Sequence, residues 1–441
     1  MTHYALTNKK LITNEMQQES NMTKPLTKKT IAAIVIGNAL EWYDFIVYSF
    51  MTVFIANLFF PTINPINSIL LATATFGVAF FMRPIGGIVF GLCADKYGRK
   101  LAITLIMFLM LLATAILCLV PTYAQIGIAA PMLMLFARLL QGFSAGGEFG
   151  IATAVLVELA PKQERGYYAS WQMVGQMLAM LLGSVIGTFI TSLFSPAQIM
   201  AGIWRVPFIF GLVIAPIAIY LRQHLDEIHI DIGFTDASSK PSIRIKLQQH
   251  FRNILIAMGL VAGGTVSTYT TISYMPTYVT HQLHLPMYKS FISLAIGILV
   301  MLILIPLFGW LSDRIGRKKI LVFSISLYLI SILPLFAWLI ATPTFLTLLV
   351  IQLIFCMLLS AYFGVFAVTI AELFPKSIRG TGLAISYNLT VMLFGGFAQF
   401  IVTWLMHITG SALAITYYLI PAVVISLMAS LFYKEERNEN A

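Results

Sequence analysis

The chain carries one ten-residue motif twice, each time between hydrophobic stretches long enough to cross a membrane. The first copy is Gly-Leu-Cys-Ala-Asp-Lys-Tyr-Gly-Arg-Lys at 91–100, and the second is Gly-Trp-Leu-Ser-Asp-Arg-Ile-Gly-Arg-Lys at 309–318. A second motif recurs with nearly the same offset, as Glu-Leu-Ala-Pro-Lys-Gln-Glu-Arg-Gly at 158–166 and Glu-Leu-Phe-Pro-Lys-Ser-Ile-Arg-Gly at 372–380. A period of this size is too long for a solenoid repeat and indicates two duplicated half-domains.

The composition requires lipid as the main solvent. Hydrophobic residues make up 59% of the 441 residues and charged residues only 10%, which is too little polar surface for a soluble globule. A spanning helix needs about 20 mainly apolar residues. By this measure twelve spans are predicted, over 31–59, 67–93, 101–121, 130–159, 167–193, 204–222, 251–279, 289–311, 319–340, 345–373, 380–408 and 411–433. The expected fold class is therefore an all-α membrane protein with twelve transmembrane helices in two pseudo-symmetric six-helix bundles.

The distribution of charge predicts the topology. The net charge is +10, and the basic residues gather in alternate loops, whereas the loops near 60–67, 121–130, 194–203 and 408–411 contain none. The positive-inside rule then places both termini in the cytoplasm. We expect a cytoplasmic tail over 1–30, bundles over 31–222 and 251–433, a cytoplasmic linker over 223–250 and a second tail over 434–441. Because topology explains the basic excess, a nucleic-acid partner is not expected.

Several classes of protein lack their usual signals here. Residues 1–30 are polar, so no cleaved signal peptide is expected. Cys93, Cys118 and Cys356 lie in predicted spans without metal-ligand spacing, and the seven histidines are scattered. No nucleophile–base pair marks an enzyme, and both tails are short for a signalling domain. We expect neither an enzyme nor a sensor, and no metal or cofactor.

Charged residues inside the spans are functional candidates, because a charge at the bilayer centre costs at least ~2.5 kcal/mol. Glu41 and Asp44 lie three residues apart on one side of the first span. Two carboxylates close together in a low dielectric repel each other, so one of them is expected to carry a proton. Both are candidates for proton coupling. The alternative is that each pairs with an arginine and stabilises the bundle.

Two arginines in the spans need anions, because arginine cannot release its proton. Arg83 precedes a run of small residues in the second span, and Arg138 shares the fourth span with Glu148. A carboxylate substrate could satisfy Arg83, and Arg138 and Glu148 are further candidates for proton coupling. An internal salt bridge from Arg83 to Asp44 or Glu148 is the alternative.

Uncharged polar and aromatic residues in the spans are candidates for the substrate site. They are Tyr43, Tyr48, Trp171, Gln172 and Gln176 in the first half and Tyr269 and Asn388 in the second. The charged groups are thus concentrated in the first half, opposite a neutral hydrogen-bonding wall. The threonines near Tyr269 are expected to bond to their own helix backbone.

The duplicated motifs supply candidates for gating. Their charged groups can form ion pairs and cap helices between neighbouring bundles, closing one conformation and releasing in the other. The candidates are Asp95, Gly98, Arg99, Glu158 and Arg165 in the first half and Asp313, Gly316, Arg317, Glu372 and Arg379 in the second. We expect them to affect transport rate without contacting substrate.

These motifs resemble the signatures of a known superfamily. The loop motif at 91–100, its copy at 309–318 and Arg-x-x-Gln-Gly at 138–142 are similar to those of the major facilitator superfamily, over residues 31–433. Further segments resemble its metabolite:proton symporter family: Gly-Asn-x-Leu-Glu-Trp-Tyr-Asp-Phe at 37–45, Arg-Pro-Ile-Gly-Gly at 83–87, Gln-Gly-x-Ser-x-Gly-Gly-Glu at 141–148, Trp-Arg-x-Pro-Phe at 204–208, Glu-Leu-Phe-Pro at 372–375 and Tyr-Asn at 387–388.

The resemblance implies a proton-coupled symporter that imports a small polar metabolite by alternating access. An organic acid is the expected substrate. Uptake of a zwitterion such as proline or betaine is the alternative, and export by proton antiport a weaker one. Carried over by motif, Asp44 and Glu41 would be proton-linked, Arg83 and Arg138 would serve coupling or substrate binding, and Asp95 with Arg99 would form the gate. A monomer in a bacterial inner membrane is expected, with metabolite, proton and lipid as its partners.

Two departures from the family narrow these expectations. Osmosensing betaine and proline carriers end in a long coiled coil, whereas this chain stops eight residues after Tyr433 without heptads. Drug-exporting relatives carry a Gly-Pro pair in the fifth span, whereas 167–193 contains no proline. The first departure argues against osmosensing and the second against export.

Overall fold

The computed structural model describes residues 28–97, 99–146, 148–158, 160–213, 249–375 and 378–435. Within these ranges the regular structure is entirely helical. Gly98, most of the expected linker and parts of both expected tails lie outside the described residues.

The first half of the described chain forms nine α-helices, α2 to α10, and two short 3₁₀ turns. Their bounds are α2 Lys28–Phe50, α3 Thr52–Phe59, α4 Pro65–Tyr97, α5 Arg99–Leu119, α6 Tyr123–Ile126, α7 Ala129–Ser144, α8 Glu148–Glu158, η1 Lys162–Glu164, α9 Arg165–Leu193, α10 Pro196–Ala201 and η2 Ile203–Arg205. A short apolar helix, Ile203–Val213, includes η2 and ends this half of the described chain. The long helices occur in the order in which the hydrophobic stretches predict them, and α6 and α10 are short additional helices between predicted spans.

The second half contains two helices interrupted by π-helical turns. Its elements are α13 Phe251–Ser267, η3 Thr268–Ser273, α14 Met275–Gln282, α15 Met287–Ile315, α16 Arg317–Ala341, α17 Phe345–Glu372, α18 Arg379–Thr390, η5 Val391–Gly395, α19 Ala398–Thr409, η6 Ala412–Ala414 and α20 Ile415–Phe432. The π-helical turns are η3 and η5. Such turns are frequent at functional sites, and η3 contains the predicted site residue Tyr269.

Each of the twelve predicted spans has a helical counterpart. Among the described residues, eight helices are long and apolar enough to cross a membrane. The first span is a ninth, bent by 61° between Val35–Phe50 and Thr52–Phe59. Three shorter apolar helices, Thr104–Leu119, Ala129–Ser144 and Ile203–Val213, match the third, fourth and sixth spans. The observed architecture is therefore consistent with the expected twelve-helix fold.

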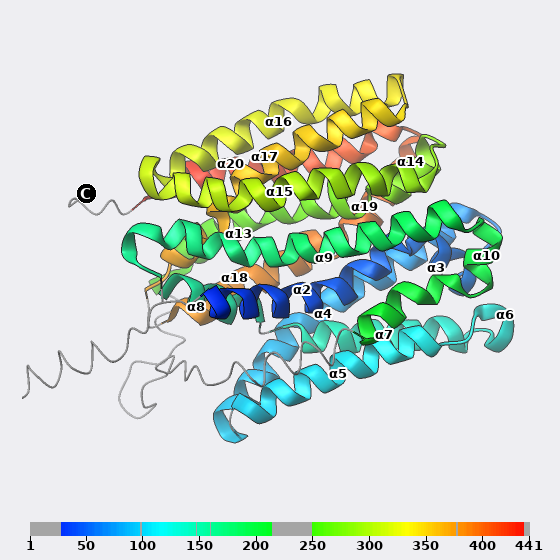
Figure 1. The fold of residues 1–441 in the computed structure, drawn as a ribbon, viewed down its shortest axis with the longest axis horizontal. Coiled ribbons are helices and arrows are strands. Elements are labelled where there is room, and N and C mark those ends of the chain that lie inside the picture. The colour runs from blue at the N-terminus through cyan, green and yellow to red at the C-terminus, as the bar shows by residue number, and fades with distance from the viewer. Residues whose placement is uncertain are drawn as a thin grey trace, which may run out of the picture.

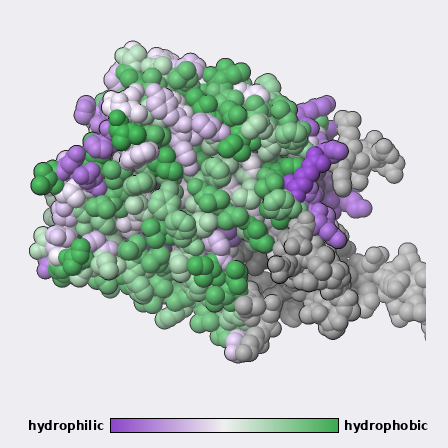
Figure 2. Space-filling model, turned by 180° about the vertical axis from the view of Figure 1, so that it is seen from behind, coloured by the Kyte–Doolittle hydropathy of each residue, from purple (hydrophilic) through white to green (hydrophobic). Residues whose placement is uncertain are grey.

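The helices lie roughly along one direction, with the two halves side by side (Figure 1). Helices α9 and α15 run against each other and form the most extensive contact between the halves. In the view from behind, hydrophobic surface covers much of the molecule, and strongly hydrophilic residues gather towards its two ends (Figure 2). The hydrophobic surface between the two hydrophilic ends is what the hydrocarbon core of a bilayer requires of a protein that spans it. Below, the end that carries Asp313 is called the motif end and the opposite end is called the far end.

Glycines allow α4 and α7 to approach closely, as the small residues after Arg83 predict. A Cβ atom at Gly142 would lie 1.7 Å from the Ala79 carbonyl oxygen, and one at Gly86 would lie 1.8 Å from that of Phe143. At Gly146, the distance to the Arg83 carbonyl oxygen would be 2.0 Å. Only glycine fits at such backbone-to-backbone contacts, so this packing fixes the position of Arg83 relative to α7.

Candidate functional site

A small cavity lies between the two halves of the molecule. Its volume is about 20 Å³, room for roughly one water molecule. Helices α2, α9, α13, α17 and α18 and the π-helical turn η3 contribute its walls. The lining residues are Trp42, Met173, Gln176, Gly264, Thr265, Thr268, Tyr269, Phe363, Phe366 and Tyr387. Five of these ten residues are aromatic, so ring surfaces form a large part of the wall.

Two predicted site residues bring polar atoms without partners to this cavity. The Tyr269 hydroxyl and the Gln176 Nε2 atom are buried and form no hydrogen bond. The Tyr269 ring packs edge-on against Phe76, with ring centres 5.7 Å apart, and against Phe80, with ring centres 5.5 Å apart. A buried polar atom without a partner costs free energy. A ligand that bonds to these atoms would therefore recover that cost.

Arg83 lies beside the aromatic wall. Its guanidinium carbon is 4.5 Å from the ring centre of Phe45, 4.6 Å from that of Phe80 and 5.3 Å from that of the cavity residue Trp42. The side chain is buried, and Nε has no hydrogen-bond partner. No carboxylate among the described side chains lies within 4.0 Å of it. The rings stabilise the cation and leave it able to accept an anionic group.

Arg138 is held in a similar aromatic environment. Its guanidinium carbon lies 4.6 Å from the ring centre of Tyr48, 4.7 Å from that of Phe45 and 4.9 Å from that of Phe76. Phe45 therefore has an arginine over it from both α4 and α7. The side chain is fully buried, and both Nε and Nη2 lack partners.

Asp44 is connected to Arg138 through two intervening side chains. The Asp44 carboxylate accepts a hydrogen bond from the Thr114 hydroxyl at 2.9 Å. Thr114 accepts a long one, 3.4 Å, from the Gln141 amide, and Gln141 accepts one from Arg138 at 2.7 Å. We call Asp44, Thr114, Gln141 and Arg138 the relay. The ion pair that the sequence led us to consider is absent among the described residues.

The position of Asp44 explains why the ion pair is absent. A Cβ atom at Gly211 would lie 2.4 Å from the Asp44 carboxylate, so this oxygen is directed towards the sixth span. The second predicted carboxylate, Glu41, is partly exposed, and its Oε2 atom is buried without a partner. The structure contains no contact between Glu41 and Asp44 among the described interactions.

The remaining predicted binding residues have packing contacts. Tyr43 and Tyr48 donate hydrogen bonds to the carbonyl oxygens of Pro207 and Ala72, at 2.9 and 3.1 Å, within the first half. Trp171 packs edge-on against Tyr167, and its Nε1 atom lacks a partner. Gln172 is fully buried, with both side-chain polar atoms unpaired, but does not line the cavity. Their substrate-binding role stays a prediction.

Asn388 joins the two halves on the motif-end side of the cavity. Its amide donates to the Gly146 carbonyl oxygen at 2.6 Å, from α18 to the turn between α7 and α8. The neighbouring Tyr387 stacks on Phe149 of α8, with ring centres 3.7 Å apart. Tyr387 also lines the cavity, so this stack closes the cavity towards the motif end.

At the motif end, Asp313 caps a helix of the other half. Its carboxylate accepts hydrogen bonds from the backbone N–H groups of Gly166 and Tyr167, at 2.8 and 3.0 Å, in the first turn of α9. These N–H groups have no partner within their own helix, and the positive helix terminus favours an anion. Asp313 thus connects the halves, and its role in gating stays a prediction.

Ion pairs complete this contact. Arg379 bonds to Glu158 across the halves at 3.1 Å. Arg317 bonds to Glu372 and lies 3.5 Å from Asp313. Gly316 has a φ of 95°, a left-handed conformation that favours glycine. The Arg165 Nε atom is buried without a partner. Gly98 and the side chains of Asp95, Arg99 and Glu148 lie outside the described residues.

A polar cluster that sequence reasoning missed closes the far end. Ser49 and Ser273 share a hydrogen bond of 2.6 Å between the halves, and the Gln399 amide donates to both hydroxyls, at 2.5 and 3.1 Å. All three residues are buried. We call Ser49, Ser273 and Gln399 the far-end cluster. Uncharged residues distant in sequence carry no motif, so only their contact distinguishes them.

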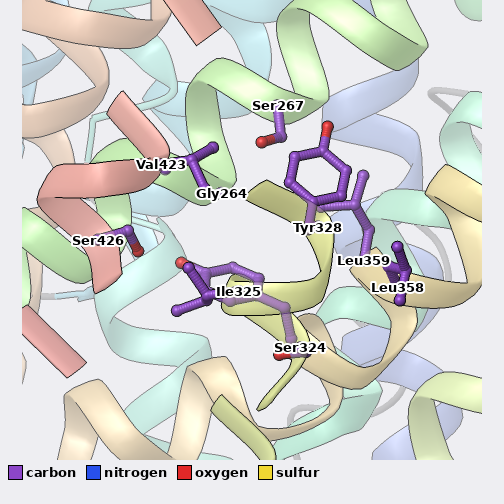
Figure 3. Close-up of a pocket in the computed structure, with 11 residues that line it drawn as sticks. Gly264, Ser267, Ser324, Ile325, Tyr328, Leu358, Leu359, Val423 and Ser426 are labelled. Carbon is purple, nitrogen blue, oxygen red and sulfur yellow. The ribbon is translucent and has the colours of Figure 1, made fainter. Parts of the chain in front are cut away.

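A second cavity, of about 10 Å³, lies behind α13 within the second half. Figure 3 shows Tyr328, Leu358 and Leu359 on one side of it and Val423 and Ser426 on the opposite side. Gly264 lines both cavities. A Cβ atom there would lie 2.4 Å from the Tyr362 ring, so only glycine fits at this shared wall.

Comparisons with known proteins show the family. The chain matches the model of the Major Facilitator Superfamily over residues 45–387 and 287–441. It is 34% identical over 427 residues to the "Glycine betaine/proline/ectoine/pipecolic acid transporter OusA" of Dickeya dadantii (strain 3937), covering 93% of this chain and 84% of the relative. It is 33% identical over 430 residues to the "Proline/betaine transporter" of Escherichia coli (strain K12), with the same coverage.

Solved structures show the same fold. The D-xylose-proton symporter superposes with a TM-score of 0.69 at 17% identity, covering 92% of this chain and 97% of that one. An inward-open structure of the xylose transporter XylE from E. coli gives a TM-score of 0.70 at 17% identity, covering 93% and 97%. The chain belongs to the major facilitator superfamily, and it is a multi-pass membrane transporter rather than an enzyme. The expected superfamily is thereby confirmed.

Proposed function

We propose that this protein imports a zwitterionic solute of the proline and betaine type, driven by a proton gradient. The relatives named as proline and betaine transporters support this substrate over the organic acid that the sequence first favoured. The proposal also takes the motif end as cytoplasmic, in line with the positive-inside rule, in the inner membrane of a bacterium.

The observation that carries the proposal is the aromatic cavity with a cation next to one of its lining residues, Trp42. A methylated ammonium group cannot donate strong hydrogen bonds and binds best to aromatic faces, which Trp42, Tyr269 and Phe363 offer. The carboxylate of the same solute requires a donor, and Arg83 lies against the ring of Trp42. A zwitterion satisfies both demands, whereas a dicarboxylate would place a second charge among the rings.

The cavity must expand around such a solute, since its present volume is about 20 Å³. Contacts between the halves close both of its sides: the Tyr387–Phe149 stack lies towards the motif end and the far-end cluster lies on the other side. We infer that transport alternates between states in which one of these contact sets opens. A solute that contacts aromatic rings of both halves would stabilise the intermediate in which both sides of the cavity are closed.

Asp44 is the proposed site of the coupling proton. Its carboxylate is buried and has a hydroxyl rather than a cation as its hydrogen-bond partner. Protonation would remove a buried charge and change the hydrogen bonds of the relay, which reaches Arg138 beside the aromatic residues of the site. Coupling would then run through Thr114 and Gln141 rather than through a direct ion pair between Asp44 and an arginine.

Uptake into proteoliposomes tests the substrate and the coupling together. We expect radiolabelled betaine or proline to accumulate under an inward proton gradient and a protonophore to abolish the accumulation, whereas citrate and 2-oxoglutarate should not accumulate. Accumulation of an acid in place of the zwitterions would contradict the substrate assignment. Accumulation that survives the protonophore would contradict the coupling.

A substitution at the proposed proton site gives a separate test. Asp44→Asn retains the shape of the side chain but cannot release a proton. We expect it to abolish accumulation against a gradient while exchange of external for internal betaine continues. Uphill accumulation with unchanged pH dependence in this variant would show that Asp44 is not the coupling residue.

A further inference from the structure

A groove open to the surface lies between α13 and α20, away from the central cavity. Its volume is about 300 Å³, and it is lined by Arg252, Leu255, Ile256, Gly259, Ile425, Ala429 and Phe432. Six of the seven lining residues are apolar or glycine. It runs from the motif end for seven residues along α13, which corresponds to about 10 Å of helix. That length takes it from the membrane interface into the hydrocarbon of one leaflet.

Small residues form the floor of this groove. A Cβ atom at Gly259 would lie 2.6 Å from the Ala429 Cβ atom, so the two helices are in contact there. The larger side chains of Leu255 and Phe432 flank the floor and are 52% and 64% exposed. Two helices that touch at small residues between protruding apolar side chains leave an apolar furrow between them.

Arg252 provides a cation at the interfacial end of the groove. It lies in the first turn of α13, is exposed, and has no carboxylate within 4.0 Å among the described side chains. Two acidic side chains at this end have other partners: Glu372 bonds to Arg317, and Glu435 accepts hydrogen bonds from the backbone of Arg317 and Lys318. Among the described residues, the charge of Arg252 is thus left without an acidic partner.

We propose that this groove binds one anionic phospholipid, with its phosphate on Arg252 and an acyl chain along Gly259 and Ala429. A basic side chain beside an apolar furrow at the cytoplasmic interface matches both parts of such a molecule. A second copy of the chain fits less well, because a two-fold contact would bring another Arg252 to the same patch. The lipid would brace α13 against α20, and α13 leads into η3 and Tyr269 of the central site.

Native mass spectrometry of the purified full-length protein tests this site. The probes are phosphatidylglycerol and phosphatidylcholine, added at equal concentration. We expect the wild type to retain one phosphatidylglycerol molecule and to retain phosphatidylcholine weakly. Arg252→Gln should lower phosphatidylglycerol retention about fivefold or more, the loss expected for one charge-assisted hydrogen bond. Leu255→Trp, which fills the groove from an exposed position, should lower it as well.

Lys319→Gln is the matched control, because Lys319 is an exposed cation at the same end of the molecule but does not line the groove. Its lipid retention should equal that of the wild type. Equal retention in the wild type and Arg252→Gln, or equal retention of the two lipids, would overturn the proposal. A dimer that Leu255→Trp dissociates would instead identify a second copy as the occupant. Elution as a single symmetric peak in size-exclusion chromatography confirms that each variant is folded.

Discussion

At the scale of single residues, the central site is defined by polar atoms that have no partner. Tyr269 and Gln176 bring such atoms to the cavity, and Arg83 has a buried Nε atom without one. Native proteins rarely leave buried polar atoms unpaired unless function requires it. Sequence analysis selected all three residues, because polar side chains stand out in hydrophobic spans. It could not recognise Phe363 and Phe366, which resemble any other core phenylalanine until the fold places them at the cavity.

Tyr269→Phe tests the role of the hydroxyl. The ring keeps its contacts with Phe76 and Phe80, so we expect unchanged thermal stability or a small increase, because an unpaired buried hydroxyl is removed. The apparent KM for betaine should rise roughly two- to tenfold, the loss of one hydrogen bond. Tyr269→Ala should in addition lower the melting temperature. An unchanged KM in Tyr269→Phe would remove the hydroxyl from the site.

Thr114→Val tests the relay. Valine has nearly the shape of threonine but cannot bridge the Asp44 carboxylate and the Gln141 amide. We expect weaker proton-driven accumulation and a displaced pH profile of uptake, with little change in betaine binding. Thr114→Ser keeps the hydroxyl and should restore both. A pH profile that is identical in all three proteins would show that the relay does not contribute to coupling.

At the scale of elements, glycine contacts set the distance between α4 and α7. The repeated small residues predicted a close approach, and the structure confirms it at Gly86, Gly142 and Gly146. The sequence did not reveal which carbonyl each glycine faces, because that depends on the rotation of both helices. The π-helical turns η3 and η5 were not predicted either, since a π-helical turn inserts one residue without a distinct sequence signal.

Gly142→Ala tests this contact. The added methyl group would overlap the Ala79 carbonyl oxygen, so α4 and α7 must separate. We expect a loss of about 1–3 kcal/mol of stability, the usual cost of overpacking, seen as a lower melting temperature in detergent. Gly380→Ala is the control, because a Cβ atom at Gly380 would have no other atom within 4 Å. Gly127→Ala is not suitable, because Gly127 has a positive φ that alanine disfavours. Equal melting temperatures for Gly142→Ala and Gly380→Ala would contradict the packing argument.

At the scale of the whole molecule, the two ends are closed by different chemistry. The motif end uses charges, through Asp313 on the first turn of α9 and the Glu158–Arg379 pair. The far end uses the neutral far-end cluster. The duplicated motifs contain the residues of the charged contacts, so the sequence marks them. Ser49, Ser273 and Gln399 carry no motif and meet only because the two bundles face each other.

Weakening the two ends should shift the conformational equilibrium in opposite directions. Asp313→Asn reduces the charge that caps α9 and should favour opening of the motif end. Gln399→Ala removes the donor that joins Ser49 and Ser273 and should favour opening of the far end. Single cysteines are placed between the halves near each end, in a background without the three native cysteines. The rate at which each cysteine is labelled measures how often that end opens. The double variant should return towards the wild-type ratio of motif-end opening to far-end opening. If both substitutions increased opening of the same end, the prediction would be contradicted.

The membrane class, the duplication, the positions of the spans and the superfamily could be predicted from the amino-acid sequence, because hydrophobic length and repeated motifs are local properties of the chain. It also selected Tyr269 and Gln176, whose unpaired polar atoms reach the cavity. Tertiary structure alone decided that Asp44 contacts Thr114 rather than an arginine, that Phe45 lies between two guanidinium groups, and that aromatic residues of both halves form one cavity. These features depend on helix rotation and on the contact between bundles, which arise from packing over long sequence separations.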